Sequence, residues 1–315
     1  MNGARKTAWL LARVALTVAL LALILRKVSP GEIAGALAGA AVWPLVAGLA
    51  LGAGFTAVKA FRWGWLLRRL GIACAPNEAL RSYLGGMAVG LTTPGRVGEV
   101  ARSLYLAAPD RAYVSGAALV DKVLDVTVIV TAGAAGCAAQ RFFTAAALLA
   151  LFAVALVTGI FLPARAVKAA ARAVPFAPAR RLAERLVRPA AEARHGTRAL
   201  ALLQAAGAFV LAAVQFHLFL SAFVAAPARA TVFVMPLLVL SNLIPVTLSG
   251  VGVREWASVI LFSTYSVPGA IAVNVALLVF FSNSLVPGLA GTALAPRWRV
   301  PAASAEHGAV GEAAR

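Results

Sequence analysis

Residues 242–255 read Asn242-Leu-Ile-Pro245-Val-Thr-Leu-Ser-Gly250-Val-Gly252-Val-Arg254-Glu255 and interrupt an otherwise apolar region of the chain. Proline removes a backbone donor and glycine weakens a helix, so the sequence predicts that a helix breaks here. Broken backbone at membrane depth is tolerated only where protein buries it or where it lines a water-filled cavity. A charge at that depth costs about 2.5–3.5 kcal/mol on insertion scales and marks a functional position. We therefore expect a polar site at this break.

A second stretch with the same ingredients lies far upstream, Gly90-Leu-Thr-Thr-Pro94-Gly95-Arg96-Val-Gly98-Glu99-Val-Ala-Arg102. Two interrupted apolar segments at corresponding places in two halves of a chain point to the binding site of a transporter. The alternative is that both are turns outside the membrane, but their flanks are apolar on both sides. The candidate site residues are Pro94, Gly95, Arg96, Gly98, Glu99 and Arg102 in the first break and Asn242, Pro245, Gly250, Gly252, Arg254 and Glu255 in the second.

The composition indicates an all-α integral membrane protein. Of 315 residues, 62% are hydrophobic, and the mean hydropathy is +0.88, whereas soluble domains are about half apolar. The apolar runs are long and do not alternate with polar residues, so the spans are predicted to be helices rather than strands. Cys74 and Cys137 form no CxxC pair and the three histidines lack ligand spacing, so we expect neither a metal nor a cofactor.

The net charge of +18 is predicted to reflect membrane topology rather than nucleic-acid binding. The arginines cluster in loops beside apolar spans, as the positive-inside rule and contact with anionic headgroups require. No combined aromatic and basic motif for nucleic acid accompanies them. We expect a multi-pass protein of the cytoplasmic (inner) membrane with no nucleic-acid partner.

A single membrane domain is predicted over residues 1–295, followed by a disordered cytoplasmic tail over 296–315. Between the first two spans, residues 26–40 are expected to form a short connection, either with or without an interfacial helix. The basic loop 163–198 is expected to form an amphipathic helix on the anionic leaflet or to act only as a topology signal. The predicted full spans are 9–25, 42–61, 113–139, 142–162, 200–224 and 268–294.

Each interrupted segment is predicted to be a re-entrant hairpin. With that assignment, the basic clusters except Arg26-Lys27 fall on one side, which places both termini in the cytoplasm. Lys59 and Arg62 are counted in this argument as part of the loop after the second span. The two halves then have opposite orientations, which indicates an inverted repeat. If each hairpin instead crosses the membrane twice, every loop stays on the same side. Six spans with two hairpins and ten shorter crossings therefore both fit the distribution of basic residues.

The predicted span 113–139 contains three charged residues, Asp121, Lys122 and Asp125. The two aspartates are four residues apart and therefore share one helix face. They form either an interfacial cluster, with Lys122 reaching toward the headgroups, or the wall of a cavity that faces the first break.

Taken in order, Thr93-Pro94-Gly95-Arg96-Val97-Gly98-Glu99 with Arg102, then Asp121-Lys122-Val-Leu-Asp125, then Pro245 through Glu255, resemble one known family. It is the lysylphosphatidylglycerol synthase transmembrane family, the flippase-like domain of multiple peptide resistance factors and of many stand-alone proteins. The resemblance covers residues 5–295, and Lys122 stands where we would expect arginine. No aminoacyl-transferase domain is expected after the last span, so lysyl transfer is not implied.

The resemblance implies movement of a lipid or a lipid-linked headgroup across the membrane. Half-helix N-termini and Arg96 and Arg254 are expected to hold the phosphate, while Glu99 and Glu255 orient the arginines or take a proton. Alternatively, these pairs only lock the hairpin tips. No Walker motif is present. The predicted partners are an anionic phospholipid or a polyprenyl-phosphate-linked substrate and a lipid-synthesis enzyme. An integral membrane enzyme using the carboxylates, or a scaffold, is the alternative function.

Overall fold

The computed structural model describes residues 15, 17–93, 96–108, 110–225, 227–242 and 250–294. Within these residues every regular element is a helix, as predicted. Four helices of this part are long and apolar enough to cross a membrane. They are α3 (Val42–Arg69), α6 (Phe143–Phe161), α9 (His195–Ser221) and the run Gly269–Leu294. Residues 9–14 and 16 of the first predicted span and the whole predicted tail 296–315 lie outside the described residues, and residues 17–27 are helical.

The other helices connect and cover these four. The run Gly269–Leu294 consists of α12 (Gly269–Phe280), the π-helical turn η2 (Phe281–Leu285) and α13 (Val286–Leu294). The remaining elements are α2 (Pro30–Ala38), α4 (Pro76–Thr92), the 3-10 helix η1 (Val97–Tyr105), α5 (Arg111–Ala139), α7 (Ala164–Arg172), α8 (Ala177–Glu192), α10 (Ala228–Ser241) and α11 (Val253–Ser263).

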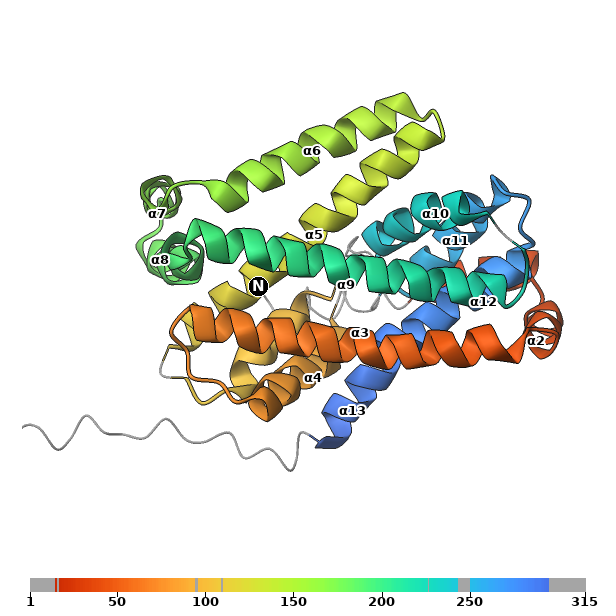
Figure 1. The fold of residues 1–315 in the computed structure, drawn as a ribbon, viewed down its shortest axis with the longest axis horizontal. Coiled ribbons are helices and arrows are strands. Elements are labelled where there is room, and N and C mark those ends of the chain that lie inside the picture. Colours follow the sequence, from red (N-terminus) through yellow and green to blue (C-terminus); the bar gives the residue numbers. More distant parts are fainter. Residues whose placement is uncertain are drawn as a thin grey trace, which may run out of the picture.

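The connection over residues 26–40 contains a helix, α2, as the sequence allowed. Ser29 caps it, because its hydroxyl accepts from the Glu32 N–H while the Glu32 carboxylate accepts from the Ser29 N–H at 2.7 Å. Figure 1 shows α2 at one end of the long helices α3 and α9, and α7 with α8 at the opposite end. The long helices therefore run between two short helical ends.

Helices α3 and α9 form an antiparallel pair at the centre of the molecule. The Ala41 N–H at the start of α3 donates to the Ala222 carbonyl at the end of α9 at 2.7 Å. Two glycines one turn apart on α3 allow this approach. A Cβ on Gly48 would lie 2.5 Å from the Phe219 ring, and one on Gly52 would lie 2.6 Å from Nε2 of Gln215. Small residues at such positions let membrane helices pack closely.

The two halves of the chain pack on each other reciprocally. Helix α5 follows the first interrupted segment and packs on α10 of the second, while α13 follows the second and packs on α4 of the first. A glycine permits each contact. A Cβ on Gly136 would lie 2.8 Å from the Val232 carbonyl oxygen, and one on Gly291 would lie 2.1 Å from the Leu84 carbonyl oxygen. Each half therefore supports the broken segment of the other.

Two predictions about basic residues are wrong. Helix α3 does not end at residue 61 but continues to Arg69, so Lys59 and Arg62 lie within it and are only 8% and 1% exposed. Arg198, counted in the basic loop, is also buried and donates to four backbone carbonyls, those of Ile160, Leu162, Ala190 and Ala193. Basic residues ordinarily indicate the end of a membrane span. Lys59, Arg62 and Arg198 instead lie inside the protein, because each has partners there that compensate its charge.

The basic loop forms two helices, α7 and α8, rather than one. Helix α8 packs on the start of α5, where a Cβ on Gly116 would lie 2.1 Å from the Leu186 carbonyl oxygen. The Tyr113 hydroxyl donates to Glu192 at 2.8 Å. Leu182 of α8 is 52% exposed. The basic residues on these two helices that remain exposed are Arg165, Lys168, Arg172, Arg180, Arg181, Arg185 and Arg188.

Candidate functional site

A cavity of about 160 Å³ lies where the two interrupted segments meet. The first segment contributes Arg96 and Glu99, and the second contributes Asn242 and Arg254. The charged residues of α5 that line it are Lys122 and Asp125. Residues that are more than 140 positions apart in the chain thus share one cavity, as the paired-break argument predicts.

Charge is distributed unevenly over the cavity wall. Four cationic side chains line it, against two anionic ones, Glu99 and Asp125. The cations are Lys59, Arg96, Lys122 and Arg254. The surplus of positive charge is suited to an anion, because low local polarity strengthens charge interactions there.

The cavity also has an apolar wall. Three of the helices that contribute to it are α5, α9 and α10, with Val126, Ile129, Phe209, Ala212, Met235 and Leu238. A cavity with few polar groups and a largely apolar lining is typical of small-molecule sites. Here the polar groups and the apolar wall together fit an amphipathic ligand.

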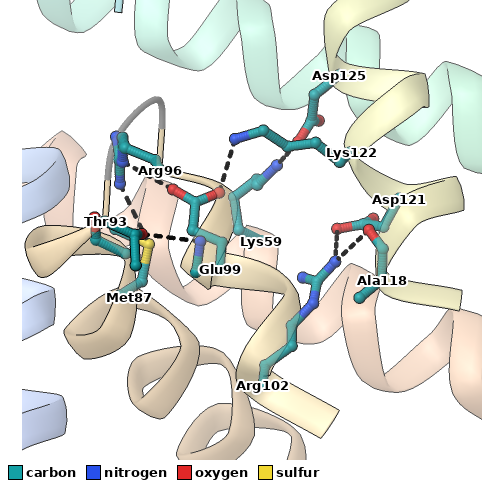
Figure 2. A network of polar contacts seen from close by, with 12 residues as sticks. Lys59, Met87, Thr93, Arg96, Glu99, Arg102, Ala118, Asp121, Lys122 and Asp125 are labelled. Carbon is teal, nitrogen blue, oxygen red and sulfur yellow. Dashed lines mark hydrogen bonds and ion pairs between the residues drawn. The ribbon is translucent and has the colours of Figure 1, made fainter. Parts of the chain in front are cut away.

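The first break is held by an ion-pair relay, shown in Figure 2. Arg96 adopts a left-handed conformation with φ of 56°, and its Nε lies 2.7 Å from Oε1 of Glu99. The other carboxylate oxygen of Glu99 accepts from Nζ of Lys122 at 2.7 Å. Thr93 Oγ1 accepts from the Gly98 N–H at 2.8 Å. The 3-10 helix η1 therefore has one of its first N–H groups, that of Gly98, already bonded within the protein.

A buried cluster of charges lies behind the cavity wall. Arg62 Nη2 is 2.7 Å from an oxygen of Asp121 and 2.7 Å from an oxygen of Asp125. Arg102 Nη2 lies 2.9 Å from the second Asp121 oxygen and 3.0 Å from the Ala118 carbonyl. Lys59 pairs with Asp125. Buried charges require such partners, so the cluster joins α3, η1 and α5 into one unit.

Arg102 is also held from its other side. Its guanidinium lies over the Trp63 ring at 3.9 Å from the ring centre. The Trp63 Nε1–H donates to the Ser82 hydroxyl, which in turn donates to the Arg102 carbonyl at 2.8 Å. These contacts position η1 against α3 and α4, and they make Arg102 a packing residue behind the site rather than part of its lining.

Lys59 and Arg62 were missed as site residues, although the sequence holds a signal for them. They lie three residues apart, so they share one helix face. On α5, the two aspartates lie four residues apart, which also places them on one face. Matching cationic and anionic pairs of this kind on two apolar segments predict an ion-pair seam between two helices.

The second break is organised by Glu255. Its Oε2 accepts from the Gly252 N–H at 2.7 Å, and its Oε1 pairs with Nη2 of Arg254. Gly250 and Gly252 have φ of 78° and 88°, values that favour glycine. The Arg254 guanidinium lies 4.3 Å from the centre of the Phe280 ring. Glu255 thus caps α11 and holds Arg254 at the cavity, where Arg254 Nε has no partner among the described residues.

The predicted residues divide into three groups. Those that line the cavity are Arg96, Glu99, Lys122, Asp125, Asn242 and Arg254. Those beside them that hold the lining in place are Gly98, Arg102, Asp121, Gly250, Gly252 and Glu255. Those that lie outside the described residues are Pro94, Gly95 and Pro245.

Polar side chains inside the apolar helices form hydrogen bonds to neighbouring helices. The ring of His217 shares a hydrogen bond of 3.0 Å between Nδ1 and the Thr231 hydroxyl. Asn274 Nδ2 donates across helices to the Ile33 carbonyl at 2.8 Å. Asn283 also bonds across helices, to Gln215 of α9, and it lines the cavity.

A family model described as the lysylphosphatidylglycerol synthase TM region matches residues 10–291. No curated protein matches the chain at a significant level. The matched region contains both interrupted segments, the α5 charges and the four apolar spans except the last three residues of the run Gly269–Leu294. The chain therefore belongs to the lysylphosphatidylglycerol synthase TM region family and is a multi-pass helical membrane protein.

Proposed function

We propose that this protein is a lipid flippase or transporter, which moves a phospholipid or a lipid-linked headgroup across the cytoplasmic membrane. The observation that carries the proposal is the cavity, where four cationic side chains and an apolar wall adjoin at the two breaks. A headgroup must otherwise cross about 30 Å of hydrocarbon without polar contacts. A polar cavity lowers that barrier, and an apolar wall suits the adjoining lipid chain.

In this proposal, Arg96 and Arg254 contact the phosphate of the headgroup. Each is held by a carboxylate of its own segment, Glu99 or Glu255. Pairing through one nitrogen leaves other guanidinium donors for phosphate oxygens, and such charge-assisted bonds are roughly twice as strong as neutral ones. Lys59 and Lys122 supply further positive charge from α3 and α5. The substrate is then an anionic phospholipid or a polyprenyl-phosphate-linked lipid, supplied by a lipid-synthesis enzyme.

The arrangement proposed for the membrane is six full spans with two re-entrant hairpins, related as an inverted repeat. The reciprocal contacts of α5 with α10 and of α13 with α4 support this arrangement. Both termini are placed in the cytoplasm. Lys59 and Arg62 are buried and therefore do not count as loop charges. Arg68 and Arg69 at the same end of α3 are exposed, and they supply the positive charge that assigns this end to the cytoplasmic side. The exposed arginines of α7 and α8 would contact the anionic cytoplasmic leaflet.

Reconstitution of the purified full chain tests the proposal. Vesicles carry a phospholipid with a fluorescent headgroup label that dithionite bleaches only in the outer leaflet. Wild-type protein should increase the bleached fraction, and Arg254→Ala should slow the exchange by about tenfold or more, since bonds to charged groups are among the stronger ones. Arg81→Ala, an exposed arginine on α4, is the matched control.

The same samples distinguish the alternatives. Mass spectrometry of copurifying lipids should show one class enriched in wild type and lost in the Arg96→Ala/Arg254→Ala double variant. Lipids converted to a new chemical species by the purified protein would favour an integral membrane enzyme instead. Equal exchange in wild type, Arg254→Ala and empty vesicles would overturn the transport proposal and favour a scaffold role.

A further inference from the structure

The cavity carries a hydrogen-bond acceptor whose orientation is set by a chain of amides. Gln215 of α9 donates from Nε2 to the Gly48 carbonyl at 3.1 Å and to the Ser282 hydroxyl at 2.8 Å. Asn283 donates from Nδ2 to Oε1 of Gln215 at 2.7 Å. Asn283 lines the cavity, and its Oδ1 has no partner among the described residues.

The amide of Asn283 cannot be turned round without breaking this chain. A backbone carbonyl such as that of Gly48 only accepts hydrogen bonds, so Gln215 must present its nitrogen there. The Gln215 oxygen is then an acceptor and requires the nitrogen of Asn283. Oδ1 of Asn283 is consequently left as an acceptor. A buried acceptor without a donor is costly, and in native proteins it calls for an explanation.

The surrounding helix is built to hold this chain in place. Asn283 lies in the π-helical turn η2, and single π turns inside α-helices are frequently found at functional sites. These hydrogen-bonded amides and Ser282 are packed tightly against α3, since a Cβ on Gly52 would lie 1.7 Å from the Ser282 hydroxyl oxygen. Gln215 is fully buried. Among the described residues, the cavity lining therefore includes polar atoms without a hydrogen-bond partner on Arg254 (Nε), Asn242 (Oδ1) and Asn283 (Oδ1), and the chain of amides sets the orientation of the Asn283 acceptor.

We infer that Asn283 selects the lipid by accepting a hydrogen bond from a hydroxyl or ammonium group on the headgroup of an anionic phospholipid. This inference rests on the proposed function and narrows its substrate class. The phosphate of a phospholipid can only accept hydrogen bonds, so it pairs with donors such as those of Arg254 and leaves the Asn283 acceptor unpaired. A headgroup donor next to the phosphate satisfies Asn283 as well. A lipid without that donor leaves the acceptor unpaired, and sites built around polar groups reject such analogues.

Two lipids that differ in this one respect test the inference. Phosphatidylglycerol and phosphatidylmethanol carry the same charge and can have the same acyl chains, but only phosphatidylglycerol has headgroup hydroxyls. Native mass spectrometry of the full chain in detergent, titrated with each lipid, gives the ratio of the two dissociation constants. The wild type should bind phosphatidylglycerol about fivefold tighter, the effect of one neutral hydrogen bond.

Three variants assign the preference to Asn283. Asn283→Leu should reduce the ratio to about one, and Gln215→Leu, which frees the Asn283 amide to rotate, should lower it part of the way. Gln204→Leu is the matched control, because Gln204 is a second amide of α9 with an unpartnered oxygen but does not line the cavity. Its ratio should equal that of wild type.

The outcomes separate this inference from the proposed function. Tight binding of both lipids by wild type with a ratio of one, or a wild-type ratio retained in Asn283→Leu, overturns the role of Asn283 while leaving the cavity as a lipid site. Binding of neither lipid by wild type overturns both. If Asn283→Leu does not fold, the ratio in Gln215→Leu decides, and an unchanged ratio there overturns the inference.

Discussion

The guanidinium of Arg62 lies 2.7 Å from the carboxylate of Asp121, and these side chains are only 1% and 2% exposed. The contact joins α3 to α5 across the centre of the molecule. It places the next residue of α5, Lys122, within 2.7 Å of Glu99 at the cavity. A buried ion pair thus sets the position of the charges that face the ligand.

Replacing Arg62 by methionine should destabilise the protein strongly. Asp121 would lose one of its two arginine partners and Asp125 would lose Arg62 as well, and breaking a buried ion pair costs about 3–5 kcal/mol. Thermal unfolding in detergent measures the effect as a lower Tm. Arg81→Met on the exposed face of α4 is the control and should leave the Tm nearly unchanged. Equal Tm values for the two variants would contradict the structural role of Arg62.

Removing the charge of Lys122 should weaken ligand binding more than stability. Lys122→Gln takes one of four cations from the cavity lining and one of two partners from Glu99. We expect about tenfold weaker binding of phosphatidylglycerol, and Lys122→Arg should retain most of the affinity because the charge is kept. Native mass spectrometry measures both. Lys168→Gln on exposed α7 is the control, and an equal loss in that variant would indicate a general effect of charge.

The contact of α13 with α4 should tolerate no added methyl group. In Gly291→Ala the new Cβ would lie 2.1 Å from the Leu84 backbone oxygen, so the helices must separate, at a cost of roughly 1–3 kcal/mol. Gly159→Ala on α6 has no atom within 4 Å of its new Cβ and should gain up to about 1 kcal/mol from helix propensity. Tm measurements on both variants should therefore change in opposite directions. A Tm for Gly291→Ala at or above wild type would refute the close packing.

Acid should loosen α8 from α5. Burial alone raises the pKa of Glu192, but hydrogen bonds from Arg188 and Tyr113 outweigh it and leave that pKa below its usual 4.5. A lowered folded-state pKa stabilises docking at pH values above 4.5, and this contribution is lost as the pH falls through the lower value. Hydrogen exchange of α8, corrected for intrinsic rates, should rise below pH 4.5. In Glu192→Gln that rise should be smaller, and an identical rise would assign it to other groups.

Much of the fold and part of the site follow from local sequence patterns. The breaks and the last apolar run are predicted because proline, glycine and apolar length act over a few neighbouring residues. Arg96, Glu99, Asn242 and Arg254 were identified for the same reason, since charge and amide groups are rare in apolar runs. The end of α3 was misplaced because Lys59 and Arg62 read locally as the start of a loop.

A helical membrane protein with two interrupted segments can be recognised from the amino-acid sequence, because length, hydropathy and helix breaking are local properties of the chain. Which charges meet depends on the tertiary packing. Lys59 and Asp125 are 66 residues apart, and Asn283 and Gln215 are 68 apart. Contacts over such separations depend on how glycine-lined helices pack and on which partner each buried charge or amide reaches. The spacing of charges along one helix marks a face that can form ion pairs, but it does not specify the residue that this face meets.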